Sequence, residues 1–197
     1  MKAKSVRSIV TGTLSICIVL GVWQYLSATG KVNALLLPTP VAVFKAAAAM
    51  TVSGELPWDT AVSLLRVVAG FLAAMVIAVP LGVLMGLWWP VRDSVTPLIE
   101  VLRPVPPIAI IPIAMLWFGI GETSKIFLIA YGAFFPILLN TISGCRAIDP
   151  VHSRAVQSVG AKRWDVIRHV IILSAFPHIV VGARLGMAMG FIVLVAA

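Results

Sequence analysis

Residues 60–87 read TAVSLLRVVAGFLAAMVIAVPLGVLMGL, a run in which Arg66 is the one charged residue. A helix needs about 20 apolar residues to cross the hydrocarbon core of a bilayer. This run is therefore long enough to span a membrane. Trp88 and Trp89 follow it directly, and tryptophan is enriched where a helix leaves the hydrocarbon for the interface. The stretch predicts a transmembrane helix.

The composition of the whole chain agrees with a membrane environment. Hydrophobic residues make up 60% of the sequence and charged residues 11%, whereas a soluble domain carries about 25% charged residues. With loops included, 197 residues allow about five crossings. We therefore expect an all-α fold, a polytopic transmembrane helical bundle formed as a single domain over residues 1–197.

Four further apolar runs are expected to cross the membrane. The first of these runs, residues 9–26, is read as a retained helix and not as a signal peptide, because no small-residue cleavage site follows it. Between the first two spans, Leu37-Pro38-Thr39-Pro40 cannot form regular helix, and Val41–Met50 is predicted to form a short helix along the membrane surface. The further spans are predicted at residues 9–26, 97–118, 126–144 and 170–197. A short loop is expected at Arg92 and Asp93, and a tight external turn at residues 119–125, which include Glu122.

The span at 97–118 is interrupted by Arg103-Pro104-Val105-Pro106-Pro107. Irregular backbone at membrane depth is tolerated only where it is buried in protein or lines a cavity. Two interpretations stay open: a broken helix beside a translocation path, or a span that begins after Pro107 with the prolines at the interface. The candidate path residues are Arg103, Pro104, Pro106 and Pro107.

Gly82 and Gly86 form a small-xxx-small pair within the run at 60–87. Such a pair permits two membrane helices to approach closely. Glycine is also simply common in membrane helices, and this alternative stays open.

The basic residues predict the orientation. Cytoplasmic flanks of membrane proteins collect Lys and Arg, and an N-terminus inside the cell places ten of the fifteen basic residues on that side. The prediction is a multi-pass protein of the cell inner membrane. Because topology already explains the net charge of +8, we expect no nucleic-acid binding. The ten residues are Lys2, Lys4, Arg7, Arg92, Arg103, Arg146, Arg154, Lys162, Arg163 and Arg168.

Other classes of function fit the sequence less well. Cys17 and Cys145 have no CxxC partner and no histidine at metal-ligand spacing, so we expect no metal and no cofactor. An intramembrane enzyme needs ionisable groups at depth, and the best candidates, Glu100 and Arg103, lie near the cytoplasmic end of their span. The chain is not expected to be an enzyme. A channel or ion-driven carrier would need intramembrane carboxylates or a selectivity filter.

The segment from Asp149 to Pro177 carries the strongest functional signal. Asp149 is a good N-cap, and the helix it begins should run to about Val159. Gly160 should then adopt the left-handed conformation that ends a helix. A second short helix is predicted from Ala161 to about His169, with Trp164, Ile167 and Val170 or Ile171 on one side. On composition alone, a docking element for a soluble partner and a solvated amphipathic loop both stay open.

The pattern of this segment resembles the EAA loop of importer permeases, which reads Glu-Ala-Ala, three residues, Gly, and a later apolar-Pro end. Ala155 and Gly160 match the first part, whereas Arg154 replaces the usual acid and Val156 the second alanine. The loop, about residues 146–177, would be the contact with the ATPase. The coupling residues that the resemblance implies are Arg154, Ala155, Gly160, Ala161, Lys162, Arg163, Trp164 and Pro177.

The resemblance covers nearly the whole chain. It indicates a permease subunit of an ATP-binding cassette importer, in the nitrate/sulfonate/taurine branch of the binding-protein-dependent transport inner-membrane component family. The family implies a second permease copy, most simply a homodimer, a cytoplasmic ATP-binding cassette ATPase dimer that hydrolyses the ATP, and a periplasmic or extracellular solute-binding protein. It also implies a small anion as solute, with an aliphatic sulfonate such as taurine first and nitrate second. The runs that carry the resemblance are Leu37–Pro40, Ser63–Val67, Pro80–Gly82, Leu102–Pro107, Trp117–Glu122 and Gly182–Gly186.

The chain stops at Ala197 inside an apolar run. Members of the family that this chain resembles continue through an external turn into another helix. We therefore expect a C-terminally truncated permease that lacks the last helix of the family.

Overall fold

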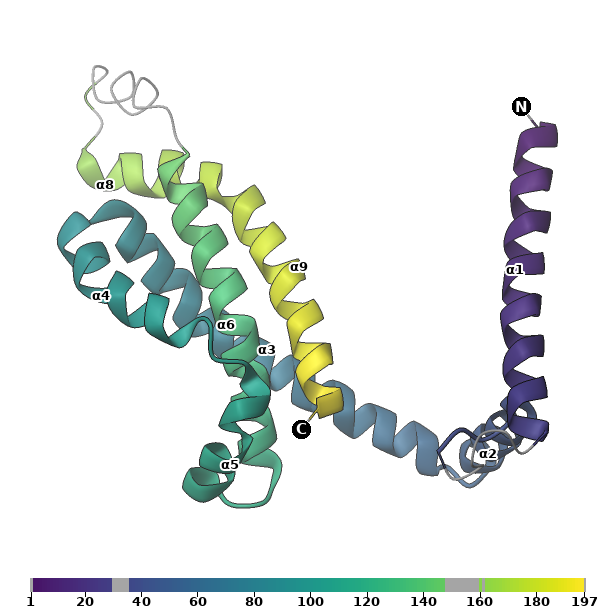
Figure 1. The fold of residues 1–197 in the computed structure, drawn as a ribbon. Helices are drawn as coiled ribbons and strands as arrows, with labels where there is room; N and C mark the ends of the chain where they lie inside the picture. The colour runs from purple at the N-terminus through teal and green to yellow at the C-terminus, as the bar shows by residue number, and fades with distance from the viewer. Residues whose placement is uncertain (1, 30–35, 148–159, 161, 197) are drawn as a thin grey trace. The chain divides into compact units, whose positions relative to one another are not determined.

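The computed structural model describes residues 2–29, 36–147, 160 and 162–196, without the side chains of residues 2–10 and 163. Within these ranges the chain is helical and contains no strand, as Figure 1 shows. Four helices in the described part are long and apolar enough to cross a membrane, or five spans if one bent pair counts as a single span. The predicted all-α polytopic bundle of about five spans is thereby confirmed.

The chain divides into two compact units, residues 1–61 and 62–197. The first unit contains α1 (Lys2–Ala28) and α2 (Pro40–Val52), and α3 (Glu55–Leu87) begins in it. The indole N–H of Trp23 donates to the carbonyl of Pro38 at 3.1 Å. Thr39 caps α2, because its hydroxyl accepts the N–H of Ala42 at 3.2 Å. The short helix predicted here is present as α2, and its place along the membrane surface stays a prediction.

In the second unit α6 (Glu122–Arg146) is the central helix, packed against both α3 and α9 (Ile172–Ala196). It contributes most of the fully buried large side chains, and Figure 1 shows α9 running beside it. These buried side chains of α6 include Leu128, Ile129, Ile137, Leu138 and Thr141.

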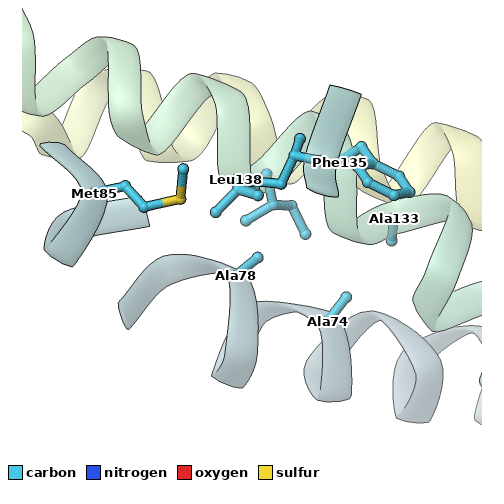
Figure 2. Close-up of a cluster of buried hydrophobic side chains, with 8 residues drawn as sticks. Ala74, Ala78, Met85, Ala133, Phe135 and Leu138 are labelled. Atoms are coloured by element: carbon cyan, nitrogen blue, oxygen red, sulfur yellow. The ribbon is translucent and has the colours of Figure 1, made fainter. Parts of the chain in front are cut away.

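The contact between α3 and α6 depends on small residues. A Cβ added at Gly82 would lie 2.7 Å from the Cβ of Thr141, and one added at Gly86 would lie 2.5 Å from the Cβ of Cys145. Real Cβ atoms do not approach so closely, so both positions require glycine. Of the two interpretations left open for this pair, close helix contact is the one that the structure shows. Figure 2 shows the same contact one and two turns earlier, where Ala74 and Ala78 of α3 face a cluster from α6.

The contact between α6 and α9 follows the same rule. An added Cβ at Gly182 would lie 2.8 Å from the Cβ of Asn140, and one at Gly186 would lie 2.8 Å from Cγ1 of Ile137. Without a strong hydrophobic drive between helices in lipid, close backbone packing of this kind holds membrane helices together.

The predicted third span is broken. Its two halves are α4 (Trp89–Leu102) and α5 (Pro107–Phe118), which meet at an angle of 98°. Helix is present on both sides of the prolines, and a pair bent this sharply fits either a broken span or a re-entrant loop. At 12 residues, α5 is only about 18 Å long, which is too short to cross a bilayer alone.

Three predicted boundaries were wrong. Arg92 and Asp93, expected in a loop, lie in α4, which begins at Trp89 with a proline in its first turn. Glu122, expected in an external turn, opens α6, where its negative charge complements the helix dipole. The third concerns the short helix predicted at 161–169. It is continuous with the last span: α8 (Arg163–Val166) leads through a π-helical turn, η1 (Ile167–Ile171), directly into α9.

Candidate functional site

A cavity of about 550 Å³ lies at the break between α4 and α5. Its wall is formed by the connection between these two helices, by the middle of α6 and by α9. The lining residues are Arg103, Val105, Pro106, Pro107, Tyr131, Gly132, Phe135, Pro136, Leu139, Asn140, Leu185 and Met189.

The prolines explain why the helix breaks here. Because Pro106 has no N–H, the carbonyl of Leu102 cannot receive its usual helical donor. Two other donors replace it: the hydroxyl of Tyr131 at 2.7 Å and the N–H of Val105 at 3.1 Å. The break is therefore held by a specific side chain of α6.

The neighbouring residues of α6 bring the cavity wall together. The rings of Tyr131 and Phe135 meet edge to face with centroids 5.2 Å apart. A Cβ added at Gly132 would lie 3.4 Å from Cγ of Pro107 and 2.8 Å from Cγ2 of Val193. Glycine at this position thus lets the start of α5 and the end of α9 approach α6 at one level.

The cavity combines one cation with mostly apolar walls. Arg103 ends α4 and is exposed, and within the described residues no carboxylate lies within ion-pair distance of it. Asn140 donates through Nδ2 to the carbonyl of Pro136 at 2.8 Å. A concave site with apolar walls and a few polar groups suits a small solute, and the guanidinium suits one with an anionic head.

Three of the four predicted path residues line this cavity. Arg103, Pro106 and Pro107 are in its wall, and Pro104 is not. Sequence reasoning missed the residues contributed by α6, Tyr131 and Phe135 foremost. The signal for them was weak, because tyrosine and phenylalanine are ordinary members of a membrane helix.

Of the predicted coupling residues, Arg154, Ala155 and Ala161 lie outside the described residues. Gly160 has φ +89°, the positive value expected for it. The N–H of Lys162 donates to Oδ2 of Asp165 at 3.1 Å, so Asp165 helps to fix the start of α8.

The other predicted coupling residues lie in the last helical stretch. Arg163 is the first residue of α8. Trp164 is exposed and Val166, two residues further along the chain, is buried. Pro177 lies inside α9 and is exposed.

An ion pair joins two motifs that are distant in the sequence. Arg66 of α3 donates to both carboxylate oxygens of Glu122, at 2.7 Å from Nη2 to Oε1 and through Nε to Oε2. The side chain of Arg66 is 19% exposed and that of Glu122 is 58% exposed. A bidentate pair of this kind fixes orientation as well as distance. The pair ties α3 to the start of α6.

Within the described ranges, no group of three or more His, Cys, Asp or Glu side chains could hold a metal ion. Cys17 is exposed and Cys145 is buried.

Residues 78–197 match the family model described as "Binding-protein-dependent transport system inner membrane component". The chain belongs to this family. The matched residues run from the middle of α3 through the broken span and α6 to the end of α9, so they include the whole cavity. The family resemblance found in the sequence is confirmed.

Relatives within this transport family match most of the chain. A putative ABC transporter permease protein of Methanocaldococcus jannaschii is 44% identical over 74% of this chain and 54% of its own length. The taurine transport system permease protein of Escherichia coli is 38% identical over 94% of this chain and 69% of its own length. A putative aliphatic sulfonates transport permease protein of Bacillus subtilis is 35% identical over 94% of this chain and 67% of its own length. The chain thus spans between about half and 69% of these relatives.

A more distant relative carries a different solute in its name. The bicarbonate transport system permease protein of Synechococcus elongatus is 29% identical over 89% of this chain and 66% of its own length. The names of the four relatives are those of permeases, in agreement with the prediction that the chain is not itself an enzyme.

Proposed function

We propose that this chain is the membrane-spanning permease subunit of an ATP-binding cassette importer and that it translocates a small oxyanion, an aliphatic sulfonate first of all. The observation that carries the solute class is the match to the taurine permease of Escherichia coli, which extends over 94% of this chain. The aliphatic sulfonate permease of Bacillus subtilis, which matches the same share, supports it.

The cavity at the α4–α5 break supports the same class of solute. A sulfonate group has three oxygens that accept hydrogen bonds from a guanidinium, and Arg103 offers one. An alkyl body needs apolar contact, and Phe135, Leu185 and Met189 offer that. We therefore place the solute path along this cavity, with Arg103, Pro104, Pro106 and Pro107 at its break.

The rest of the importer is proposed from the family. Two copies of the permease form the path, a solute-binding protein delivers the anion from outside, and an ATPase dimer docks on residues 146–177 from the cytoplasm. For ATP hydrolysis to drive transport, closure of the ATPases must favour one arrangement of the permease helices over another. The N-terminus lies in the cytoplasm.

Uptake by the reconstituted importer tests the proposal. The full-length permease, its ATPase and its binding protein in liposomes should accumulate labelled taurine only when ATP is present. Deletion of the permease in cells should abolish growth on an aliphatic sulfonate as sole sulfur source. A growth defect confined to a cation or a sugar would overturn the solute class.

A matched set of variants tests the cavity itself. Arg103→Gln should reduce uptake about tenfold or more, since a hydrogen bond to a charged group contributes about 1.5–3 kcal/mol. Arg103→Lys keeps the charge and should retain part of the uptake. Lys45→Gln removes an equal charge from an exposed position of α2 and should leave uptake unchanged. Equal uptake by Arg103→Gln and the unaltered importer would remove Arg103 from the path.

A planar oxyanion is the second candidate. The bicarbonate permease of Synechococcus elongatus is 29% identical to this chain, and nitrate has the same flat trigonal shape and charge as bicarbonate. Uptake of either anion in the same liposomes, without uptake of taurine or ethanesulfonate, would favour this candidate over a sulfonate.

A further inference from the structure

A second cavity, of about 380 Å³, lies beside the first, between α4 and α6. Four of its lining residues are charged, and three of these are arginines. We call it the α4–α6 groove. It is lined by Met85, Arg92, Thr96, Ile99, Glu100, Arg103, Leu139, Ile142, Ser143 and Arg146.

Two helical faces form the walls of the groove. The lining positions of α6, from Leu139 to Arg146, and those of α4, from Arg92 to Arg103, recur every three or four residues. Residues at this spacing share one face of a helix. Between its first and last arginine the α4 face is about 16 Å long, so the groove is elongated.

The groove and the first cavity are neighbours. Arg103 and Leu139 line both of them. Arg103 therefore lies at the junction of the two cavities. The other two arginines, Arg92 and Arg146, line the groove but not the first cavity.

The charges of the groove favour an anion. Within the described residues, Arg103 and Arg146 have no carboxylate within ion-pair distance, whereas Arg92 pairs with Asp93 at 3.2 Å. Glu100 is the one acidic residue in the wall. Positive-inside topology explains the sign of these residues, but it does not explain why arginines from the start of α4, the end of α4 and the last turn of α6 line a single cavity.

We propose that the α4–α6 groove is a second binding site for a small oxyanion, which receives the anion from the first cavity through Arg103. The proposal rests on the proposed function, which supplies the anion and places Arg92 and Arg146 on the cytoplasmic side. Ser143 adds a hydroxyl donor, and Ile99, Leu139 and Ile142 supply the apolar floor. The phosphate of an anionic lipid headgroup has the same chemistry as a sulfonate, so the test separates the two sources.

Protection of a thiol in the groove measures occupancy directly. Ser143→Cys is combined with Cys17→Ser, and the complete importer is placed in nanodiscs of phosphatidylcholine. The rate of alkylation by N-ethylmaleimide is then followed at constant ionic strength. Methanesulfonate should slow the reaction in a saturable way. Dimethyl sulfone, which has nearly the same size and no charge, should not.

Variants of one arginine link the protection to charge. Adding Arg146→Gln should raise the methanesulfonate concentration for half-protection about tenfold, as expected for the loss of one charge-assisted hydrogen bond. Arg146→Lys should restore most of the protection. Lys45 lines neither cavity, so Lys45→Gln is the matched control and should leave the half-protection concentration unchanged.

The outcomes are distinguishable from failure of the proposed function. Sulfonate uptake without any protection of Ser143→Cys by methanesulfonate overturns the second site alone. Protection without sulfonate uptake keeps the site and overturns the proposed solute. Protection that appears only when phosphatidylglycerol is added to the nanodiscs, with no effect of methanesulfonate, assigns the groove to a lipid headgroup and overturns the inference.

Discussion

Gly82 and Gly86 illustrate how much a single residue decides in this protein. At each position an added Cβ would lie within 2.7 Å of a side chain of α6, so the separation of two helices depends on a missing methyl group. The small-xxx-small spacing is local, so the sequence pattern could indicate close helix contact as one of two interpretations. It could not identify Thr141 and Cys145 as the partners, because nothing in the α3 sequence specifies the register of α6.

Gly82→Ala should lower the stability of the permease. The new methyl would be 2.7 Å from the Cβ of Thr141 and 3.1 Å from the carbonyl of Leu138, and overpacking of this kind costs about 1–3 kcal/mol. The measurement is the midpoint of thermal unfolding of the purified permease in detergent. Gly21→Ala is the control, since a Cβ there meets nothing within 4 Å. Equal midpoints for the two variants would contradict the packing argument.

Tyr131→Phe should weaken the break between α4 and α5. The substitution keeps the ring contact with Phe135 and removes the hydroxyl that donates to the carbonyl of Leu102 at 2.7 Å. Loss of one hydrogen bond costs about 1 kcal/mol. Thermal unfolding should show a small decrease for Tyr131→Phe and a larger one for Tyr131→Leu, which also loses the ring contact. A decrease of the same size in both variants would show that the hydroxyl, and not the ring, carries the effect.

At the scale of elements, the chain shows which helices could be predicted and which boundaries could not. Long apolar runs predicted α1, α3, α6 and α9, because the length needed to cross a bilayer is a strong constraint. The prolines indicated an interruption at residues 103–107, but they could not give the angle of 98° or the hydrogen bond from Tyr131 of α6 to the carbonyl of Leu102. The continuity of α8 with α9 has a signal in the sequence, since residues 163–172 contain no glycine or proline that would end a helix. The polar side chains of this stretch suggested an end and outweighed that signal.

The ion pair of Arg66 and Glu122 should contribute to the stability of the permease. Glu122→Gln and Arg66→Gln should each lower the unfolding temperature, because α3 then loses its tie to the start of α6. The double variant Arg66→Glu with Glu122→Arg reverses both charges and should recover part of the loss. Recovery is read from a double-mutant cycle. A double variant no more stable than the worse single variant would mean that the pair does not join these elements.

Gly160→Val should uncouple ATP hydrolysis from transport. At φ +89° a β-branched residue is strained, so the chain around Gly160 must move and the proposed docking surface with it. The importer should insert normally but show weak stimulation of the ATPase by the loaded binding protein. Gly160→Asn, a residue that tolerates positive φ better, should retain more stimulation. Full coupling in Gly160→Val would exclude this position from the docking surface.

For the molecule as a whole, the prediction still to be tested is the orientation in the membrane, with the N-terminus in the cytoplasm. Ser94 lies in the first half of α4, two residues after Arg92, and Ser53 lies between α2 and α3. Both are exposed. With the N-terminus inside, Ser53→Cys should react with a membrane-impermeant thiol reagent in intact cells and Ser94→Cys should react only after permeabilisation. Cys17→Ser serves as the background, and Cys145 is buried. The reverse pattern of reactivity would invert the proposed topology.

The π-helical turn at Ile167–Ile171 determines which way the segment before α9 faces. A π turn holds one residue more than the α-helix needs, and such turns often occur at functional sites. If the turn tightened to α geometry, everything on its N-terminal side would rotate by about 100° and shift by about 1.5 Å relative to α9. The exposed indole of Trp164 would then point in a different direction while the glycines of α9 stayed in place against α6. In such a transition, a displacement of the segment before α9 would be converted into rotation of α8 about the helix axis, while α9 kept its packing against α6.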